Sequence, residues 1–323
     1  MIGINSDKYT DIWYWNNEQW LYSLAVDVFN NDSAPDILSM SYGWAEDDQC
    51  SIATCGSMTS QQYVERVNRE YIKLALRGIS VVVASGDAGS PGRTSEGCDP
   101  ERPLNAVFPG SSPWVTSVGA TYIKANNDSH KWNSTLCQYY GCATSKEQYV
   151  TNYNDVGWTS GSGIAKYSKQ TQFYEKANND YLQSGVSLPN NLPIGGRMYP
   201  DVSLIGHYCP VIDNGDILAI DGTSCSTPLF ATIISKLNQF QVSRNKSKLG
   251  WINPVLYQMY YDASSSFDDL TNGFTWCTEF NCCDLNERNG SNFGFKATKG
   301  YDPVYGLGTP NVGKMKEWLI YNI

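Results

Sequence analysis

A serine in the C-terminal half of the chain has the sequence context of a nucleophile. Residues 221–228 read Asp-Gly-Thr-Ser-Cys-Ser-Thr-Pro, and an apolar run to Leu237 follows, which predicts that a loop turns into a buried helix at Ser224. The first N–H groups of a helix lack helical partners and favour negative charge, as an attacking hydroxyl needs. Pro228 is expected to be tolerated because the first turn needs no N–H. An ordinary serine cap is the alternative, but the full Gly-Thr-Ser-x-x-x-Pro pattern favours a nucleophile.

An aspartate after an apolar run is a second candidate. Residues 79–84 are nearly all apolar, which is typical of a parallel strand covered on both faces, and Ser-Gly-Asp-Ala-Gly follows at 85–89. Open parallel sheets bind ligands at the carboxyl ends of their strands, which is where Asp87 falls. A turn-forming aspartate explains this stretch equally well. Its pairing with Ser224 favours a functional role.

Neither histidine has the context of the general base in a Ser-His-Asp triad. His130 lies in an Asn-rich stretch and His207 in a Gly-His-Tyr-Cys turn, where a histidine is usually just solvated. If histidine does not act as the base, carboxylates must, and they do so best in acid.

The elements that must position these residues indicate an α/β fold. Helical periodicity predicts helices at 18–29, 60–77, 170–182, 224–240 and 312–320, and apolar runs predict strands at 36–41, 79–84, 114–118, 201–204 and 217–220. Residues 1–15 are predicted to form strand, turn and strand. Strand, helix and strand over residues 36–84 imply a right-handed parallel crossover. The 323 residues contain no low-complexity linker, so we expect a single domain, 1–323.

Charge and hydropathy exclude several classes of partner. The net charge is −9, from 23 basic and 32 acidic residues, and the chain has no run of Lys and Arg. Nucleic acid and anionic membranes are therefore not expected as partners. No apolar run approaches the roughly 20 residues of a membrane span, which predicts a soluble protein.

Cysteines and glycosylation sequons indicate an oxidising compartment. The ten cysteines include no Cys-x-x-Cys pair, which favours disulfides over zinc. Short-loop bridges are expected for Cys50 with Cys55 and for Cys137 with Cys142. The Asn-x-Ser/Thr sequons are at Asn31, Asn127, Asn133, Asn245 and Asn289. The first residues do not form a signal peptide, so we expect the beginning of the protein to be missing.

Several segments together resemble the sedolisin, or serine-carboxyl, peptidases, and most of all their tripeptidyl-peptidase branch. They are residues 41–43 (Ser-Tyr-Gly), 66–70 (Arg-Val-Asn-Arg-Glu), 85–89, 199–202 (Tyr-Pro-Asp-Val), 221–228, 300–303 and 306–310. They run in one collinear order from about residue 2 to the end of the chain. The resemblance implies a subtilisin-like α/β fold: a parallel sheet sandwiched between helices, with a C-terminal calcium-binding loop region.

The resemblance also implies roles for individual residues. Ser224 is expected to be the nucleophile and Asp87 the carboxyl on the oxyanion side, which can donate a hydrogen bond only when protonated. Ser41, Tyr42 and Gly43 are expected to offer backbone groups to an extended peptide.

A single Ca²⁺ ion is the cofactor that the resemblance implies. Its expected ligands are the Asp269 and Asp302 side chains and the carbonyl oxygens of Leu270, Thr298 and Gly300. Hard oxygen ligands suit calcium, whereas the residues alone would suggest two turn-capping aspartates. We expect Cys98 to pair within the 277–283 group and so to tie an upstream loop to this tail.

The sequence departs from the family pattern at two places. Asp221 stands where the family usually has Ser, which is of little consequence. The family's general base is a Glu, with an Asp four residues on, in a helix upstream of the strand that here begins near Ile2. Asp7 and Asp11 have this spacing but fall in a predicted turn. We therefore expect a Glu-x-x-x-Asp pair to be encoded just upstream, and the 323 residues alone, which also lack the family's propeptide, to be inactive.

The leading interpretation is an acid-active serine peptidase that cleaves peptides or proteins in a lysosomal or secreted location. It would cleave the peptide bond through a Ser acyl-enzyme, with a carboxyl group as general base and a second carboxyl as oxyanion acid. Tripeptidyl-peptidase action is the expected form. A non-catalytic peptide-binding homologue that lacks the base is the alternative. A neutral-pH subtilisin is disfavoured, because it needs an early His and an Asn where Asp87 stands.

Overall fold

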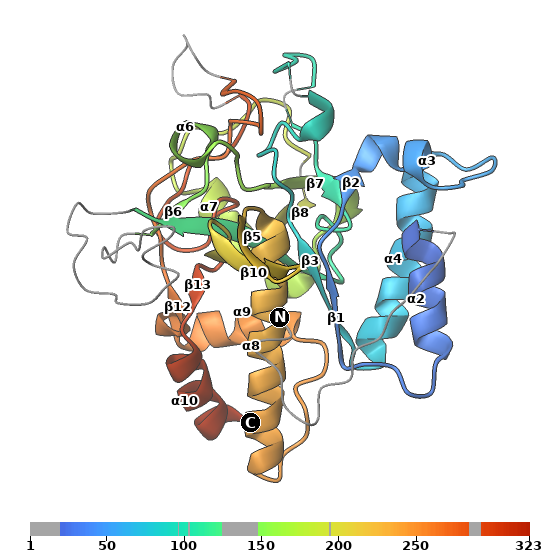
Figure 1. Ribbon diagram of the computed structural model, residues 1–323, viewed down its shortest axis with the longest axis vertical. Helices are drawn as coiled ribbons and strands as arrows, with labels where there is room; N and C mark the ends of the chain where they lie inside the picture. The colour runs from blue at the N-terminus through green and yellow to red at the C-terminus, as the bar shows by residue number, and fades with distance from the viewer. Residues whose placement is uncertain (1–19, 96, 103, 125–147, 194, 284–291) are drawn as a thin grey trace.

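The computed structural model describes residues 20–95, 97–102, 104–124, 148–193, 195–283 and 292–323 (Figure 1). Some predictions fall outside these residues. They concern the elements in 1–15 with Asp7 and Asp11, His130, the bridge between Cys137 and Cys142, and the sequons at Asn127, Asn133 and Asn289. Of the remaining sequons, Asn245 is exposed and Asn31 is half-buried in a turn.

Helices and strands alternate along much of the chain, as in an α/β fold. The α-helices are α2 (Trp20–Asn30), α3 (Gln49–Ile52), α4 (Ser60–Leu76), α6 (Tyr153–Val156), α7 (Gln172–Leu182), α8 (Thr223–Ser243), α9 (Asn253–Asp262) and α10 (Val312–Asn322). Short 3-10 helices are η1 (Glu46–Asp48), η2 (Arg93–Ser95) and η3 (Ser264–Ser266). The strands are β1 (Ile37–Met40), β2 (Trp44–Ala45), β3 (Ser80–Ala84), β4 (Val107–Phe108), β5 (Thr116–Ile123), β6 (Gln148–Val150), β7 (Gly163–Lys169), β8 (Gly196–Tyr199), β9 (Val202–Ile205), β10 (Cys209–Asp213), β11 (Asp216–Ile220), β12 (Phe267–Asp268) and β13 (Thr309–Pro310).

A five-stranded sheet forms the centre of the fold. Its order is β1-β3-β5-β6, and β9 also pairs with β5. β1, β3, β5 and β9 are parallel, whereas β6 runs antiparallel to the end of β5. The carboxyl ends of β1 and β3 therefore lie at the same edge, where ligands of such sheets bind.

Hydrophobic cores lie on both faces of this sheet. Side chains alternate between the faces of a strand, and β3 shows the division. Val82 packs with Phe230 and Ile234 of α8, whereas Val81 and Val83 belong to the core formed with α2 and α4. Helices thus cover both faces (Figure 1), and the predicted subtilisin-like sandwich is confirmed.

The boundaries of α4 follow the predicted signals. Thr59 caps the helix in a capping box with Gln62, and Gly78 follows its end with a φ of +81°. The predicted strand at 114–118 overlaps the start of β5, five residues of which follow Val118. Small and polar residues such as Gly119 interrupt the apolar pattern of β5, so the pattern alone did not indicate where this strand ends. The predicted strand at 217–220 pairs in the separate hairpin β10–β11.

Four disulfides occur among the described residues, and one of them joins segments far apart in the sequence. The predicted Cys50–Cys55 bridge is confirmed, and Cys98 pairs with Cys283, within the expected group. Two bridges were not predicted: Cys209–Cys225 and Cys277–Cys282. Every cysteine in the described part of the chain is bridged, which agrees with folding in an oxidising compartment.

A buried ion pair explains the Tyr-Pro-Asp-Val segment. The fully buried Asp201 carboxylate accepts hydrogen bonds from Arg197 Nη2 at 2.5 Å and from the Ser117 amide at 2.7 Å through Oδ2, and from the Tyr257 hydroxyl at 3.0 Å through Oδ1. These partners belong to β8, β5 and α9. The aspartate therefore holds the turn between β8 and β9 against both the central sheet and a C-terminal helix.

None of the helices in the described ranges is long and apolar enough to cross a membrane.

Glu46 in η1 is a buried carboxyl that the sequence analysis did not single out. It is 2% exposed and accepts hydrogen bonds from the Ser111 hydroxyl at 2.5 Å and from the Lys166 amide at 2.8 Å. Burial raises the pKa of Glu46 to about 7, although these hydrogen bonds lower it. This carboxyl therefore couples folding to proton uptake.

Replacing Glu46 by Gln tests this coupling. Because the folded-state pKa exceeds the unfolded value of 4.5, the stabilisation from proton uptake is complete below the unfolded pKa and lost as pH rises through 7. Ionised Glu46 then costs on the order of 3 kcal/mol. Glutamine keeps the shape without the charge, so the decline in melting temperature between about pH 5 and about pH 8 should be smaller in Glu46→Gln. The exposed Glu317→Gln is the control; equal declines in all three proteins would contradict the prediction.

Candidate active site

Ser224 is the second residue of α8, at the edge of the sheet where β1 and β3 end. Gly222 caps the helix with a φ of +137°, a conformation that favours glycine. Ser224 is half-buried, and its hydroxyl lies 3.4 Å from the carbonyl oxygen of Ser41, which follows β1. The structure thus brings the predicted nucleophile against the first of the predicted substrate-binding residues.

Pro228 is the sixth residue of α8, so the prediction that it falls in the first turn is wrong. At this position proline removes the N–H that would bond to the carbonyl of Ser224. The Ser41 hydroxyl donates to that carbonyl instead, at 3.0 Å. Ser41, predicted to act through its backbone, therefore completes the first turns of α8 with its side chain.

Tyr42 and Gly43 continue from Ser41 towards β2. Tyr42 is 52% exposed. A Cβ on Gly43 would lie 2.7 Å from a methyl carbon of Val107 and 3.0 Å from the Phe108 carbonyl oxygen, so a side chain there would displace β4. The segment is thus held against β4 by a close backbone approach, and its first two residues are exposed.

Asp87 binds the start of α8 through one carboxylate oxygen. Its Oδ1 accepts hydrogen bonds from the Thr223 amide at 2.7 Å and from the Thr223 hydroxyl at 2.8 Å. Burial raises the pKa of Asp87, outweighing these hydrogen bonds and the nearby charge of Arg93, which lower it. The carboxyl therefore keeps its proton to a higher pH than an ordinary aspartic acid does.

The second oxygen of Asp87 faces an opening left by Gly222. A Cβ built on Gly222 would lie 3.3 Å from Asp87 Oδ2 and 3.5 Å from the Ser224 amide nitrogen. The absence of a side chain therefore leaves free the position that lies close to both the carboxyl and this amide. Two such donors around one small space are what a developing oxyanion requires.

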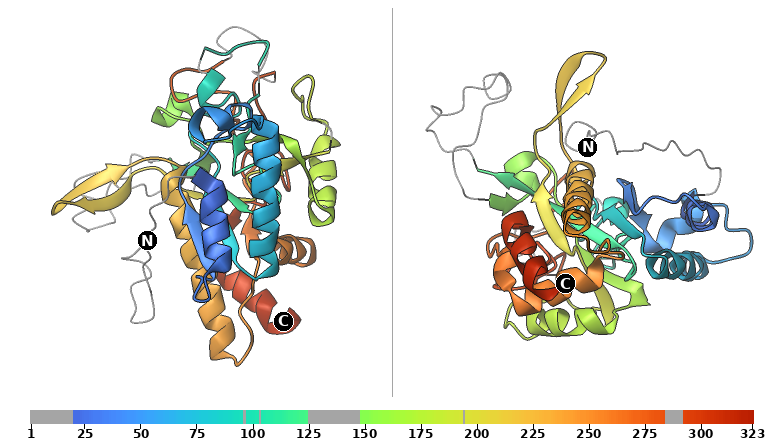
Figure 2. Two further views of the ribbon diagram at one scale, coloured as in Figure 1. Left: turned by 90° about the vertical axis from the view of Figure 1, so that its right-hand side faces the viewer. Right: turned by 90° about the horizontal axis from the view of Figure 1, so that it is seen from below.

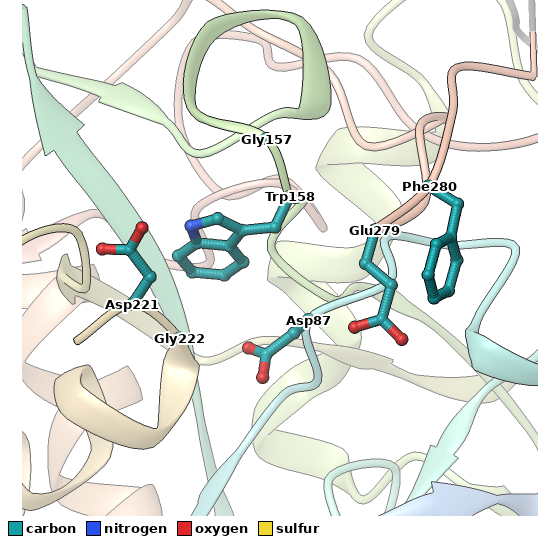
Figure 3. A pocket seen from close by; sticks show the side chains of 7 residues that line it. All are labelled: Asp87, Gly157, Trp158, Asp221, Gly222, Glu279 and Phe280. Atoms are coloured by element: carbon teal, nitrogen blue, oxygen red, sulfur yellow. The ribbon is translucent and has the colours of Figure 1, made fainter.

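A pocket of about 350 Å³ adjoins Asp87 (Figure 3). It is lined by Asp87, Gly157, Trp158, Asp221, Gly222, Glu279 and Phe280. Trp158 is buried, and its indole N–H has no hydrogen-bond partner within the described residues. The sequence analysis missed Trp158, Glu279 and Phe280, because they come from loops distant in the sequence and have no local motif.

The other carboxylates of this pocket are already paired. Glu279 accepts two hydrogen bonds from Arg93, at 2.7 and 2.9 Å. Asp221 accepts one from the Tyr208 amide at 2.7 Å, and His207 Nδ1 lies 3.0 Å away. His207 also stacks on Tyr208 with ring centroids 3.9 Å apart. Glu279 is thus engaged through both oxygens, whereas Asp87 and Asp221 each use only Oδ1 in these contacts.

The residues predicted to bind calcium lie together in the C-terminal loops. Fully buried Asp302 accepts hydrogen bonds from the amides of Thr298, Val304 and Tyr305 at 2.8 to 2.9 Å, and Asp269 accepts one from Gly300 at 2.8 Å. Burial raises the pKa of Asp302, and the charge of Asp269 raises it further. The two carboxylates are therefore close enough to repel each other.

The donor set around these carboxylates fits a hard cation. Among the described residues, the carbonyl oxygens of Leu270, Thr298 and Gly300 accept no backbone hydrogen bond, and the buried Thr298 hydroxyl has no partner. The described residues contain no cluster of three or more His, Cys, Asp or Glu side chains that could hold a metal ion. Calcium binding would therefore depend on carbonyl oxygens as well as on two carboxylates.

Comparisons with known proteins agree with this geometry. Residues 2–252 match the sequence model of the subtilase family, Peptidase_S8. Physarolisin of Physarum polycephalum is 38% identical over 313 residues, which cover 95% of this chain and 53% of that protein. Tripeptidyl-peptidase 1 of Rattus norvegicus is 34% identical over 305 residues, which cover 94% and 46%. The chain belongs to the subtilase family, in its sedolisin branch.

The solved structure of a sedolisin extends the comparison to the fold. Pseudomonas sedolisin, a serine-carboxyl proteinase complexed with pseudo-iodotyrostatin, superposes with a TM-score of 0.65 at 19% identity, covering 94% of this chain and 68% of that one. The predicted sedolisin resemblance is thus confirmed in sequence and in fold. The chain spans about half the length of the curated relatives that it matches.

A double-mutant cycle tests the link between Ser41 and α8. Ser41→Ala leaves the Ser224 carbonyl without its donor, which should lower the free energy of unfolding by about 1 to 2 kcal/mol. Pro228→Ala supplies a helical N–H for the same carbonyl, so the Ser41→Ala change should cost less in its presence. Denaturant unfolding of the four proteins measures the coupling. Additive effects would show that the two residues do not share this carbonyl.

Proposed function

We propose that this sedolisin is an acid-active serine peptidase of the tripeptidyl-peptidase kind, with Ser224 as nucleophile and Asp87 as oxyanion acid. The observation that supports the proposal is the missing Cβ at Gly222, whose position lies 3.3 Å from Asp87 Oδ2 and 3.5 Å from the Ser224 amide nitrogen. An extended peptide lies along residues 41–43 and exchanges backbone hydrogen bonds with them.

The reaction proceeds in two steps. Ser224 Oγ attacks the substrate carbonyl carbon while a general base takes its proton, and the oxyanion accepts hydrogen bonds from the Ser224 amide and protonated Asp87. The C–N bond then breaks, the amine leaves with a proton, and water hydrolyses the acyl-enzyme. A carboxylate cannot donate a hydrogen bond, so activity falls as pH rises through the raised pKa of Asp87.

The reaction also needs a general base that takes the proton of the Ser224 hydroxyl. The Ser224 hydroxyl contacts the carbonyl oxygen of Ser41, and no contact joins it to Asp221, whose Oδ1 accepts from the Tyr208 amide and lies 3.0 Å from His207 Nδ1. We therefore assign the base to the Glu-x-x-x-Asp pair that the family resemblance implies, and the proposed experiments use the full-length protein. Bridged cysteines and an acid requirement together support a lysosomal or secreted location.

Two substitutions test the proposed chemistry. Ser224→Ala should reduce turnover of peptide substrates by about four powers of ten, because only binding and oxyanion stabilisation remain. Asp87→Asn can still accept from Thr223 and donates at any pH, so activity on the alkaline side should fall less steeply than in wild type. Hydrolysis of a tripeptidyl reporter is measured across the acid range.

Ser243→Ala, at the exposed end of α8, is the control and should match wild type. Undiminished turnover by Ser224→Ala would remove it as nucleophile, and an unchanged pH profile in Asp87→Asn would remove that residue as the acid. Peptide binding by a wild-type protein without turnover would indicate the non-catalytic homologue.

We further propose that residues 269, 270, 298, 300 and 302 bind one Ca²⁺. The ion would neutralise two carboxylates whose pKa values burial raises. A chelator should lower the melting temperature and increase hydrogen exchange in residues 265–303, and added Ca²⁺ should restore both. Asp269→Asn should lose most of this response, whereas the neighbouring exposed Asp268→Asn should keep it. An equal melting temperature with and without the chelator would contradict the proposed calcium site.

A further inference from the structure

The hairpin β10–β11 projects from the body of the molecule (Figure 2). Its strands pair from Cys209 and Ile220 at the base to Asp213 and Asp216 at the tip. The turn residues Asn214 and Gly215 have φ values of +49° and +91°, as in the type I′ turn that favours tight two-residue hairpins. The projection is therefore a regular ribbon rather than an irregular loop.

Aliphatic side chains are exposed on both faces of this ribbon. Because side chains alternate along a strand, Val211, Leu218 and Ile220 share one face, and Ile212 and Ile217 the other. Ile212 is 76% exposed, and the other four are 37–45% exposed. Monomeric proteins rarely expose such a contiguous apolar surface unless it meets a partner.

The base of the hairpin is part of the candidate active site. The Cys209–Cys225 bridge ties β10 to the residue after Ser224. The Gly222 amide donates to the carbonyl of Gly206 at 2.9 Å, which closes the base. Asp221, the residue after β11, lines the same pocket as Asp87. A polypeptide bound across Ser224 therefore passes the hairpin on one of its flanks.

Charge distinguishes between possible occupants of this surface. Asp213 and Asp216 face each other at the tip, so an anionic membrane would meet two carboxylates first. The chain carries a net charge of −9, which opposes the approach of a second copy. Continuity with the active site favours the remaining occupant, a polypeptide segment.

We propose that β10–β11 is a docking arm for polypeptide substrates, which binds an extended apolar segment flanking the scissile bond. This inference rests on the proposed peptidase function. Each strand has five residues and spans roughly 17 Å at about 3.3 Å per residue. The arm therefore contacts about five substrate residues beyond those nearest the scissile bond, and short substrates do not reach it.

The experiment compares substrates of different length on the full-length protein. The double variant Ile212→Ser/Leu218→Ser removes one aliphatic side chain from each face and keeps the Cys209–Cys225 bridge. The substrates are a tripeptidyl reporter and the same tripeptide extended by about eight residues on either flank, with apolar or with Gly/Ser extensions. Leu76→Ser/Val242→Ser, exposed aliphatic residues of α4 and α8, is the matched control.

The double variant should lose about tenfold in kcat/KM on an apolar-extended peptide, mainly through KM, since a segment docked on one face buries one of these two partly exposed side chains, which contributes about this much. Its activity on the reporter and on Gly/Ser-extended peptides should stay within about twofold of wild type. Unchanged kcat/KM on both apolar-extended peptides, or an equal loss on all extended peptides, would overturn the docking arm while leaving the peptidase function intact.

Two further measurements separate the remaining outcomes. If wild-type protein turns over no substrate, the peptidase function fails, and fluorescence anisotropy of a labelled apolar-extended peptide tests the arm by binding alone. Weaker binding by the double variant than by the control then supports the arm, and equal binding overturns it. Sedimentation velocity identifies a self-association surface: a wild-type dimer that the double variant converts to monomer would also overturn the proposal.

Discussion

The hydrogen bonds from Thr223 to Asp87 fix the start of α8 against the end of β3, and the candidate site depends on this contact. Both Thr223 donors bind the same oxygen, Oδ1, so Oδ2 remains available towards the opening at Gly222. One carboxyl can therefore hold the fold through one oxygen and serve a ligand through the other. Turn formation and function were alternative interpretations of Asp87, but its geometry is compatible with both.

Two buried carboxyls make a contribution to stability that grows as the pH falls, which the net charge of the chain does not reveal. The pKa of Asp87 and that of Glu46 are both raised because their ionised forms lose hydration. Each folded-state carboxyl then binds a proton that the unfolded chain would release at the same pH, so acidification favours the folded state. The conditions that protonate the proposed oxyanion acid are thus those in which these two carboxyls contribute most to the stability of the fold.

The sequence predicted what neighbouring residues determine, and missed what depends on distant segments. The apolar run of β3, the cap and glycine stop of α4, and the Gly-Thr-Ser context of Ser224 are local patterns, and the structure reproduces the elements that they indicate. Trp158 and Glu279 reach the pocket only through long-range folding. The run at 217–220 correctly indicated a strand, but a continuous apolar run does not reveal that the ribbon is exposed on both faces.

Three consecutive residues at the start of α8 are each tied to a different part of the chain. Thr223 is bound by Asp87, Ser224 by Ser41, and Cys225 by Cys209 of the hairpin. These ties restrain the backbone around Ser224, the proposed nucleophile, and leave its hydroxyl without a charged partner. Catalytic groups depend on positioning of this kind. The ties also differ in chemistry. The Asp87 contact responds to pH, the disulfide responds to redox potential, and the Ser41 contact responds to neither, so no single change of conditions releases all three at once.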